Sequence, residues 1–331
     1  MNRPKADELD YIHFLIAAQK AFTCTEAARC QPNHLDSPAH DAFTRLLSRE
    51  PPDTEALWEE ARTLVEPEGG LLMVDDTTLD KPYSRKMELV HRHWSGKHQQ
   101  VVNGINLATL LWSKAQALVP TDFRVYDKPR DGLTKNDHFR AMLKRAKEQG
   151  FKPRYVLFDS WYSSLENLKA IRSYGWRWLC RLKSNRLVNP HKSGNVAIRE
   201  VEIGAEGQIV HLKAYGMVKV FRTVAKDGGV EHWATNDLAM SDTDREALED
   251  AGWGIEVYHR ALKQCCGIER AQVRGGWAQR NHLGLALRAF LRLEANRLEN
   301  GVSWYEAKLS IVREAVRRYL AEPLYLLSST A

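Results

Sequence analysis

Two short segments of this 331-residue chain run from four apolar residues straight into aspartate. The first, at residues 71–82, reads LLMVDDTTLDKP and contains Asp75 and Asp76, and the second, at 155–164, reads YVLFDSWYSS and contains Asp159. An unpaired carboxylate at the end of a buried strand is costly unless a partner neutralises it. A divalent metal ion is such a partner, so these segments point to metal chemistry.

A third carboxylate lies on an expected helix. Along WGIEVYHRALKQ, one polar face carries four residues at helical spacing, Glu256, His259, Arg260 and Lys263. Ligand sites in α/β proteins gather at strand ends, so this helix could aim its glutamate at the two aspartates. Three such carboxylates suit a pair of Mg²⁺ ions, for which Mn²⁺ can substitute, acting on a phosphodiester. Taken singly, each acid is explained better by a solvated surface with ion pairs, and it is their joint occurrence in order that favours a metal site.

The segments around these acids predict a mixed α/β sheet. We expect three strands in succession and then helix, strand, helix and strand, at residues 71–76, 101–112, 114–127, 134–150, 154–164, 164–175 and 176–184. Pro120 indicates an edge strand or a bulge, because proline cannot donate to a sheet hydrogen bond. This order predicts a sheet covered by helices on both faces.

The flanking segments predict further parts. The first 68 residues read as short helices with Ser37 and Asp53 as caps, which suits a helix-turn-helix DNA-binding domain or a structural bundle. A polar–apolar alternation around glycine turns then predicts a β-rich insertion, and helices follow it. The expected parts are a helical N-terminal domain at 1–68, the first part of the sheet domain at 69–184, the insertion at 185–245, and the acid-bearing helix with a helical C-terminal region at 246–331.

Three motifs in order resemble those of DDE transposases from bacterial insertion sequences, the cut-and-paste group. They read VDDTTLDKP, VLFDSWYSS and WGIEVYHRALKQCCGIERAQVR, and the resemblance spans roughly residues 70–275. It implies a ribonuclease-H-like core interrupted by a β-strand insertion before the glutamate. It also implies an enzyme that cleaves and joins DNA with bound metal.

The resemblance implies roles for individual residues. Asp76, Asp159 and Glu256 match the catalytic, metal-binding acids, and Asp76 is preferred to Asp75 because it directly precedes the two threonines. Lys263, seven residues beyond the glutamate, matches a lysine that contacts the DNA end. These roles predict that the acids meet in space.

Upstream of the glutamate, this chain departs from the family pattern in part. The family's tyrosine and arginine, seven and four residues before the glutamate, are Glu249 and Gly252 here. Trp253 matches a tryptophan that helps to expel a base from the DNA end, and we expect Trp233 to receive that base. The resemblance therefore predicts DNA contacts from the tryptophans, whereas Glu249 and Gly252 lack the family's tyrosine and arginine.

Basic residues near the motifs suit phosphate contacts. The segment 85–100 follows the first acid and is rich in cations, although a solvated loop explains it equally well, and a second basic track begins near residue 270. The candidate DNA contacts are Lys263, Arg260, His259, Trp253, Trp233, Arg92, Lys97 and Arg274.

The composition agrees with a nucleic-acid partner. The chain has 48 Lys and Arg against 42 Asp and Glu, a formal charge of +6 and a pI near 9.0, which favours polyanions weakly. Five cysteines, two of them adjacent, suit a reducing compartment. The chain shows no long apolar run and no signal-peptide pattern at its start, so we expect a cytoplasmic, nucleoid-associated protein with no membrane partner.

Together these features predict a DNA transposase that binds inverted-repeat ends, cleaves them and transfers the 3′ ends to target DNA. We expect it to act as a homodimer when bound to DNA. Two alternatives remain, a structure-selective nuclease of the same fold and a non-catalytic DNA-binding protein derived from a transposase.

Overall fold

The computed structural model describes residues 4–32, 37–49, 52–95, 99–192, 194–225 and 228–325. The chain divides into two compact units. Unit 1 consists of Met1–Asp53, Lys86–Glu88 and Arg260–Ala331, and unit 2 consists of Thr54–Arg85 and Leu89–His259.

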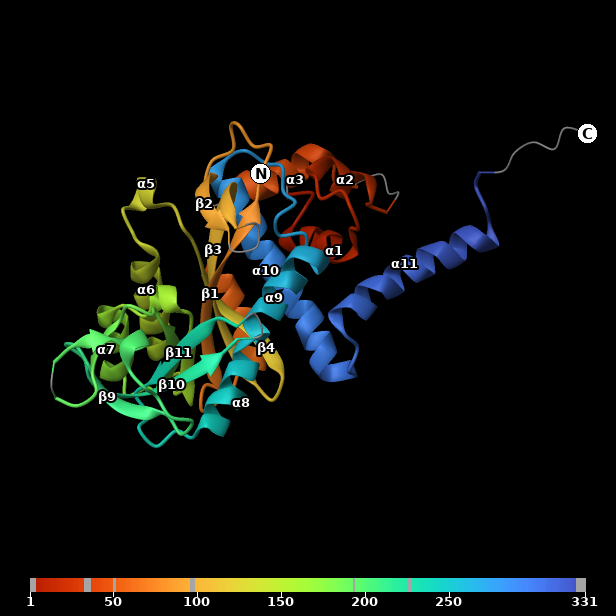
Figure 1. Cartoon of the computed structure of the whole chain (residues 1–331). Helices are drawn as coiled ribbons and strands as arrows, with labels where there is room; N and C mark the ends of the chain where they lie inside the picture. The colour runs from red at the N-terminus through yellow and green to blue at the C-terminus, as the bar shows by residue number, and fades with distance from the viewer. Residues whose placement is uncertain are drawn as a thin grey trace, which may run out of the picture. The chain divides into compact units, whose positions relative to one another are not determined.

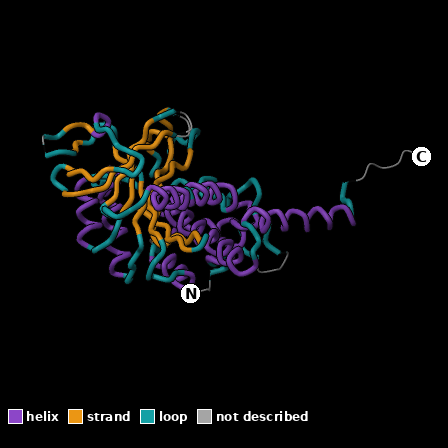
Figure 2. The backbone as a smooth tube through the Cα atoms, turned by 60° about the horizontal axis from the view of Figure 1, so that its bottom comes forward, coloured by secondary structure: helices purple, strands orange, loops and turns teal. Residues whose placement is uncertain are grey.

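Unit 2 contains one mixed sheet, whose strands are drawn in orange in Figure 2. The strand order is β2-β3-β1-β5-β6-β11-β10-β9-β7-β8, and β4 pairs with β3. The strands are β1 (Leu71–Asp80), β2 (His91–Ser95), β3 (Gln100–Lys114), β4 (Ala117–Val125), β5 (Tyr155–Phe158), β6 (Trp178–Leu182), β7 (Leu187–Asn189), β8 (Val196–Ala197), β9 (Gln208–Leu212), β10 (Gly216–Val224) and β11 (Val230–Thr235).

The centre of the sheet brings the two acidic segments together. Strand β1 pairs antiparallel with β3 and parallel with β5, and β5 pairs parallel with β6. Val74 on β1 lies opposite Phe158 on β5, and the residues that follow them are Asp75 and Asp159. The predicted mixed sheet is confirmed, and the parallel pairing of β1 with β5 stops one residue before Asp75 and Asp159.

One strand differs from the sequence expectation, and another shows an irregularity that the sequence predicted. Residues 91–95 form β2, which pairs with β3 at the sheet edge, whereas we expected no strand there. Strand β4 contains Pro120, and its register against β3 shifts between Leu110 and Leu111. Both features that the proline predicts are therefore present: β4 pairs with β3 alone, and its ladder is irregular at Pro120.

Strands β7 to β11 fall within the segment expected to be an insertion, and they continue the same sheet because β11 pairs antiparallel with β6. The remaining elements of unit 2 are helical. They are α4 (Glu55–Ala61), η1 (Arg62–Leu64), α5 (Lys128–Asp131), α6 (Lys135–Glu148), η2 (Ser160–Tyr162), α7 (Leu165–Ser173), η3 (Ile198–Glu200), α8 (Asp242–Gly252) and the first part of α9 (Gly254–Cys265).

Helix α6 shows why the sequence forms these elements. Thr134 and Asp137 form a capping box at its start, which satisfies free backbone N–H groups there. The stripe predicted from the sequence, Phe139, Met142, Leu143 and Ala146, is buried, and the helix packs on β3 and β4. Gly150 follows the helix with a φ of 87°, a conformation that glycine adopts at little cost.

Unit 1 joins helices from both ends of the chain (Figure 1). It contains α1 (Glu8–Ala17), α2 (Cys24–Arg29), α3 (His40–Arg49), the end of α9, α10 (Gly276–Asn300) and α11 (Trp304–Ala321). Helix α10 packs on α1 and α3. The caps expected at Ser37 and Asp53 are wrong, because α3 begins at His40 and the N-cap of α4 is Thr54.

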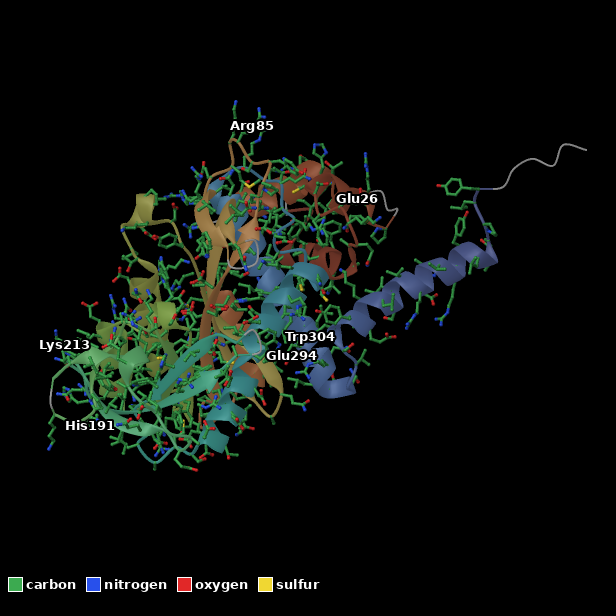
Figure 3. The ribbon with its side chains drawn as sticks, viewed as in Figure 1. Glu26, Arg85, His191, Lys213, Glu294 and Trp304 are labelled. Atoms are coloured by element: carbon green, nitrogen blue, oxygen red, sulfur yellow. The ribbon has the colours of Figure 1, made fainter. Side chains whose placement is uncertain are left out.

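Buried polar side chains stabilise the packing of the helices in unit 1. Glu294, fully buried on α10, accepts a hydrogen bond of 2.8 Å from Trp304 Nε1 and pairs with Arg297; Figure 3 labels the glutamate and the tryptophan. Lys308 Nζ donates to the carbonyls of Ile16, Ala18 and Cys265. These contacts tie α11 to α1 and to the end of α9.

All five cysteines are free thiols. Among the described helices, none is both long enough and apolar enough to span a bilayer.

Candidate active site

Asp76 is held by three donors on one face of the sheet. Its Oδ2 accepts from Asn106 Nδ2 at 2.6 Å and from Lys135 Nζ at 2.8 Å, and its Oδ1 accepts from Tyr162 O–H at 2.7 Å. Burial acts to raise the pKa of Asp76, but the Lys135 charge and the hydrogen bonds outweigh it and lower the pKa. Asp76 is therefore an ionised carboxylate that already has a cation beside it.

Asp75 faces the other way, because neighbouring residues of a strand point to opposite faces. Its Oδ2 lies 3.9 Å from His259 Nδ1 on α9, and the His259 Nε2 forms a 2.9 Å hydrogen bond with Thr109. Burial raises the pKa of Asp75 well above its usual value, and the charges of Asp76, Asp159 and Glu256 raise it further. Asp75 therefore lies within electrostatic reach of all three predicted acids.

Asp159 lies at the end of β5 and caps the short helix η2. Its Oδ1 accepts the backbone N–H of Trp161 at 2.9 Å and that of Tyr162 at 3.4 Å. Burial raises the pKa of Asp159, and the charge of Asp76 adds to the rise. Tyr162 thus binds both acids, through its hydroxyl to Asp76 and its backbone to Asp159.

Glu256 lies in the first turn of α9, where its side chain is exposed. Gly254 begins this helix, and a Cβ at that position would lie 2.9 Å from Leu118 Cδ2 and 3.8 Å from Met73 Cε. The glycine therefore allows the start of α9 to approach the sheet closely. Trp253, the C-cap of α8, is 53% exposed one turn before the glutamate.

The donor set suits a hard divalent cation in its chemistry. Burial raises the pKa of Asp75 and Asp159; the charges of Asp76, Asp159 and Glu256 add to the rise at Asp75, and the charge of Asp76 adds to the rise at Asp159. A cation would relieve this penalty. Within the described ranges, however, no group of three or more His, Cys, Asp or Glu side chains is arranged to hold a metal. Binding would therefore require side chains such as Asp76 to exchange a protein partner for the ion.

The predicted DNA contacts in unit 2 divide into accessible and buried residues. Arg92 is exposed on β2, whereas Lys97 lies outside the described residues. His259 is buried against Thr109, so it does not offer its ring to DNA in this arrangement. Trp233 is only 8% exposed, and the Arg181 guanidinium lies 5.0 Å from its ring centroid, so it has no open face for an expelled base.

The other predicted contacts belong to unit 1. Arg260 and Arg274 are exposed there. Lys263 is partly covered, and its Nζ lies 3.9 Å from Glu269 Oε2.

The sequence motifs did not identify several residues that bind the acids in the structure. Lys135 and Asn106 lie 59 and 30 residues from Asp76 along the chain, and neither belongs to a motif. Tyr162 could have been found, because it lies three residues after Asp159, one helical turn away.

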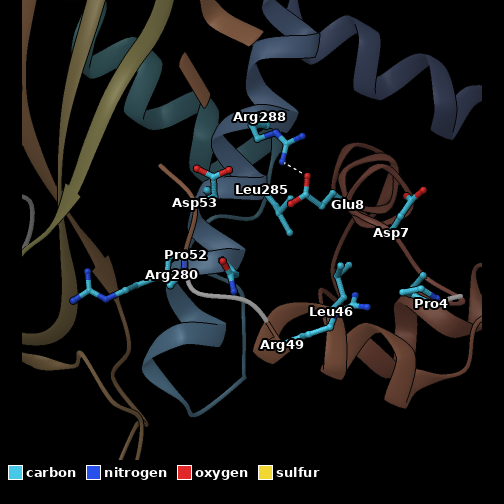
Figure 4. Close-up of a pocket in the computed structure, with 13 residues that line it drawn as sticks. Pro4, Asp7, Glu8, Leu46, Arg49, Pro52, Asp53, Arg280, Leu285 and Arg288 are labelled. Atoms are coloured by element: carbon cyan, nitrogen blue, oxygen red, sulfur yellow. Dashed lines mark hydrogen bonds and ion pairs between the residues drawn. The ribbon is translucent and has the colours of Figure 1, made fainter. Parts of the chain in front are cut away.

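Unit 1 contains a separate cavity of about 620 Å³ (Figure 4). Its lining includes three arginines and three acids, Arg49, Arg280, Arg288, Asp7, Glu8 and Asp53. Arg288 pairs with Glu8 across it. Because the charges balance, the cavity lacks the positive field of a phosphate site.

The mixed sheet, its flanking helices, the acids within β1 and the acid that follows β5 define a ribonuclease-H-like fold. The chain is similar to a solved piggyBac transposase, in a synaptic complex with hairpin DNA, with a TM-score of 0.55 and 11% sequence identity. That alignment covers 98% of this chain and 74% of the piggyBac chain.

The family model described as DDE superfamily endonuclease matches residues 23–200, more than half of the sequence. The chain therefore belongs to the DDE superfamily endonucleases, enzymes that use divalent metals. The match contains Asp76 and Asp159 and ends before Glu256. No curated relative matches the chain in sequence.

Proposed function

We propose that this protein is a DNA transposase that binds the ends of its element, cleaves them and transfers the 3′ ends to target DNA. One observation carries the proposal: the parallel pairing of β1 with β5 stops at Val74 and Phe158, directly before Asp75 and Asp159, within a chain of the DDE superfamily. The fold shared with a transposase supports it.

The residues that would hold divalent metal ions are Asp76, Asp159 and Glu256, with Asp75 as the alternative first acid. Bound Mg²⁺, or Mn²⁺ in its place, would supply a Lewis acid that activates the attacking oxygen and stabilises the leaving oxygen. Asp76 matches the first acid of the family, but the Glu256 charge acts on Asp75. Both Asp75 and Asp76 are therefore candidates for the first acid.

Residues around the acids set their protonation. Lys135, Asn106 and Tyr162 keep Asp76 ionised through a charge and three hydrogen bonds. Burial and neighbouring carboxylates favour a proton on Asp75.

The proposed partner is DNA, and we propose a homodimer on DNA because two ends must be joined to one target. The piggyBac protein of similar fold was solved with hairpin DNA, which supports a hairpin route for the second strand. Trp253, exposed one turn before Glu256, would assist such a bend, since stacking can hold an unpaired base.

The test is cleavage of DNA that carries the element ends, in Mg²⁺ and in EDTA. We expect Asp159→Ala and Glu256→Ala each to reduce cleavage by at least about a hundredfold while end binding is retained. Asp250→Ala is a matched control, because Asp250 is an exposed acid on the neighbouring helix α8. Activity in both active-site variants would exclude this site.

The same assay assigns the first acid. Loss of cleavage in Asp76→Ala but not in Asp75→Ala supports the assignment from the resemblance, and the reverse result moves the role to Asp75. A strand-joining assay separates a transposase from a structure-selective nuclease. Wild-type protein that binds DNA without metal-dependent nicking would instead be a non-catalytic derivative.

A further inference from the structure

An exposed tryptophan lies near two lysines beside the candidate active site. Trp161 belongs to η2, two residues after Asp159, and its side chain is 55% exposed. Lys135 Nζ lies 5.6 Å from its ring centroid and Lys183 Nζ lies 5.3 Å from it. Tryptophan is normally well covered, so an exposed indole here requires an explanation.

The local structure holds this indole outward. The next residue, Tyr162, is fully buried and stacks on Phe139 with ring centroids 5.2 Å apart. Asp159 binds the backbone N–H of Trp161, which fixes the turn. One aromatic residue of η2 thus anchors the helix in the core, and the other is presented to solvent.

The two lysines reach the ring from different elements. Lys183 directly follows β6, the parallel neighbour of β5. It therefore lies at the same C-terminal end of these strands as Asp159. Lys135 begins α6 and already pairs with Asp76. An aromatic face, an exposed ammonium and the acids therefore converge at one edge of unit 2.

We propose that Trp161 is a stacking platform for an unpaired nucleobase next to the scissile phosphate, and that Lys183 binds a neighbouring phosphate of the same strand. Every base has a π face, so stacking on an indole tolerates any sequence. Lys183, rather than Lys135, is the phosphate contact, because the charge of Lys135 is engaged by Asp76.

The cation contacts leave room for this role. An ammonium more than 5 Å from the ring centroid, at an exposed site, binds the ring more weakly than a stacked base does. A lysine has a long flexible stem, so it can leave the ring and follow the phosphate. The ligand is therefore a nucleotide of single-stranded or locally opened DNA. This inference rests on the proposed function and adds a residue to its substrate site.

Binding without metal tests the inference directly, because no cleavage occurs. The probes are a fluorescent strand of about ten thymidines, within the usual site size, and a strand of equal length made of abasic units. We expect the wild type to bind the thymidine strand more tightly. Trp161→Ala should weaken that binding about fivefold or more, and change binding of the abasic strand by less than about twofold.

Two further variants separate stacking from charge. Lys183→Gln should weaken binding of both strands equally, and the loss should shrink as salt rises. Trp161→Phe should retain most of the preference for bases. Trp94→Ala is the matched control, an exposed tryptophan on edge strand β2, and should leave the preference unchanged.

Equal effects of Trp161→Ala on the two strands, or no effect on either, would overturn the inference. A loss of the base preference in Trp94→Ala as large as in Trp161→Ala would overturn it too. The fate of the proposed function is decided separately by metal-dependent cleavage. Cleavage that depends on Asp159 and Glu256, together with a null result at Trp161, refutes the stacking platform alone.

Discussion

Lys135 Nζ lies 2.8 Å from Asp76 Oδ2, although the two residues are 59 positions apart in the chain. The lysine begins α6 and the aspartate lies on β1, so the pair joins a helix to the central sheet. It neutralises a carboxylate that burial alone would disfavour. The pair therefore couples the stability of unit 2 to the charge state of its candidate metal ligand.

Replacing Lys135 with methionine should destabilise the metal-free protein. The variant leaves Asp76 without its cation, and we expect the free energy of unfolding to fall by about 1 to 3 kcal/mol. Mg²⁺ should then stabilise the variant more than the wild type, since a divalent ion no longer meets a competing ammonium. Urea unfolding with Mg²⁺ and with EDTA measures both effects.

Lys144→Met is the control for this experiment. Lys144 lies on the same helix, but its pair with Glu148 is exposed and should contribute little. If Lys135→Met were as stable as this control, the Lys135–Asp76 pair would have no structural role.

Replacing Trp253 with alanine should interrupt the second strand cut. The indole is 53% exposed one turn before Glu256, and we expect it to support the unpaired base of a hairpin. First-strand nicking should continue while nicked, unreleased DNA accumulates. Denaturing gels of a cleavage time course detect both species, and normal double-strand release by the variant would contradict this role.

Lys263→Ala should weaken binding to cleaved DNA ends more than it slows metal chemistry. A lysine acts as a point charge on phosphate, so the loss should be large at low salt and fade as salt rises. Lys263 also lies 3.9 Å from Glu269, and Glu269→Gln is therefore a useful comparison that removes this negative charge beside the lysine. Wild-type affinity of Lys263→Ala at low salt would remove this residue from the DNA interface.

His93 should make unit 2 sensitive to mild acid. Burial lowers the pKa of His93 from 6.5 to about 4; the positive charges of Lys135 and His91 add to this effect, whereas Asp76 opposes it. Between these two pH values His93 is protonated in the unfolded chain but neutral in the folded protein. The free energy of unfolding therefore falls as the pH falls from 6.5 to about 4. The loss should be on the order of 1 to 3 kcal/mol.

His93→Gln should flatten this part of the stability profile, measured by urea unfolding at several pH values. His211→Gln, at an exposed position on β9, is the control and should retain the wild-type slope. An unchanged slope in His93→Gln would assign the acid sensitivity to other groups.

Local sequence patterns predicted much of unit 2. The apolar runs before Asp76 and Asp159 identified β1 and β5, and the stripe from Phe139 to Ala146 identified the buried face of α6. These predictions succeeded because strand alternation and helical spacing are short-range properties of the chain. The helix caps and the edge strand β2 were missed, since neither is fixed by periodicity alone.

The sequence by itself determined the acidic residues, their order and the class of protein to which they belong. Only the tertiary structure decided that Asp76 meets Lys135, Asn106 and Tyr162 while Asp75 faces His259 and feels the charge of Glu256. Alternation along β1 places the two aspartates on opposite faces, but what covers each face comes from residues tens to more than a hundred positions away. Such long-range packing leaves no local signature, which is why the charge environment of each acid had to be seen in the fold.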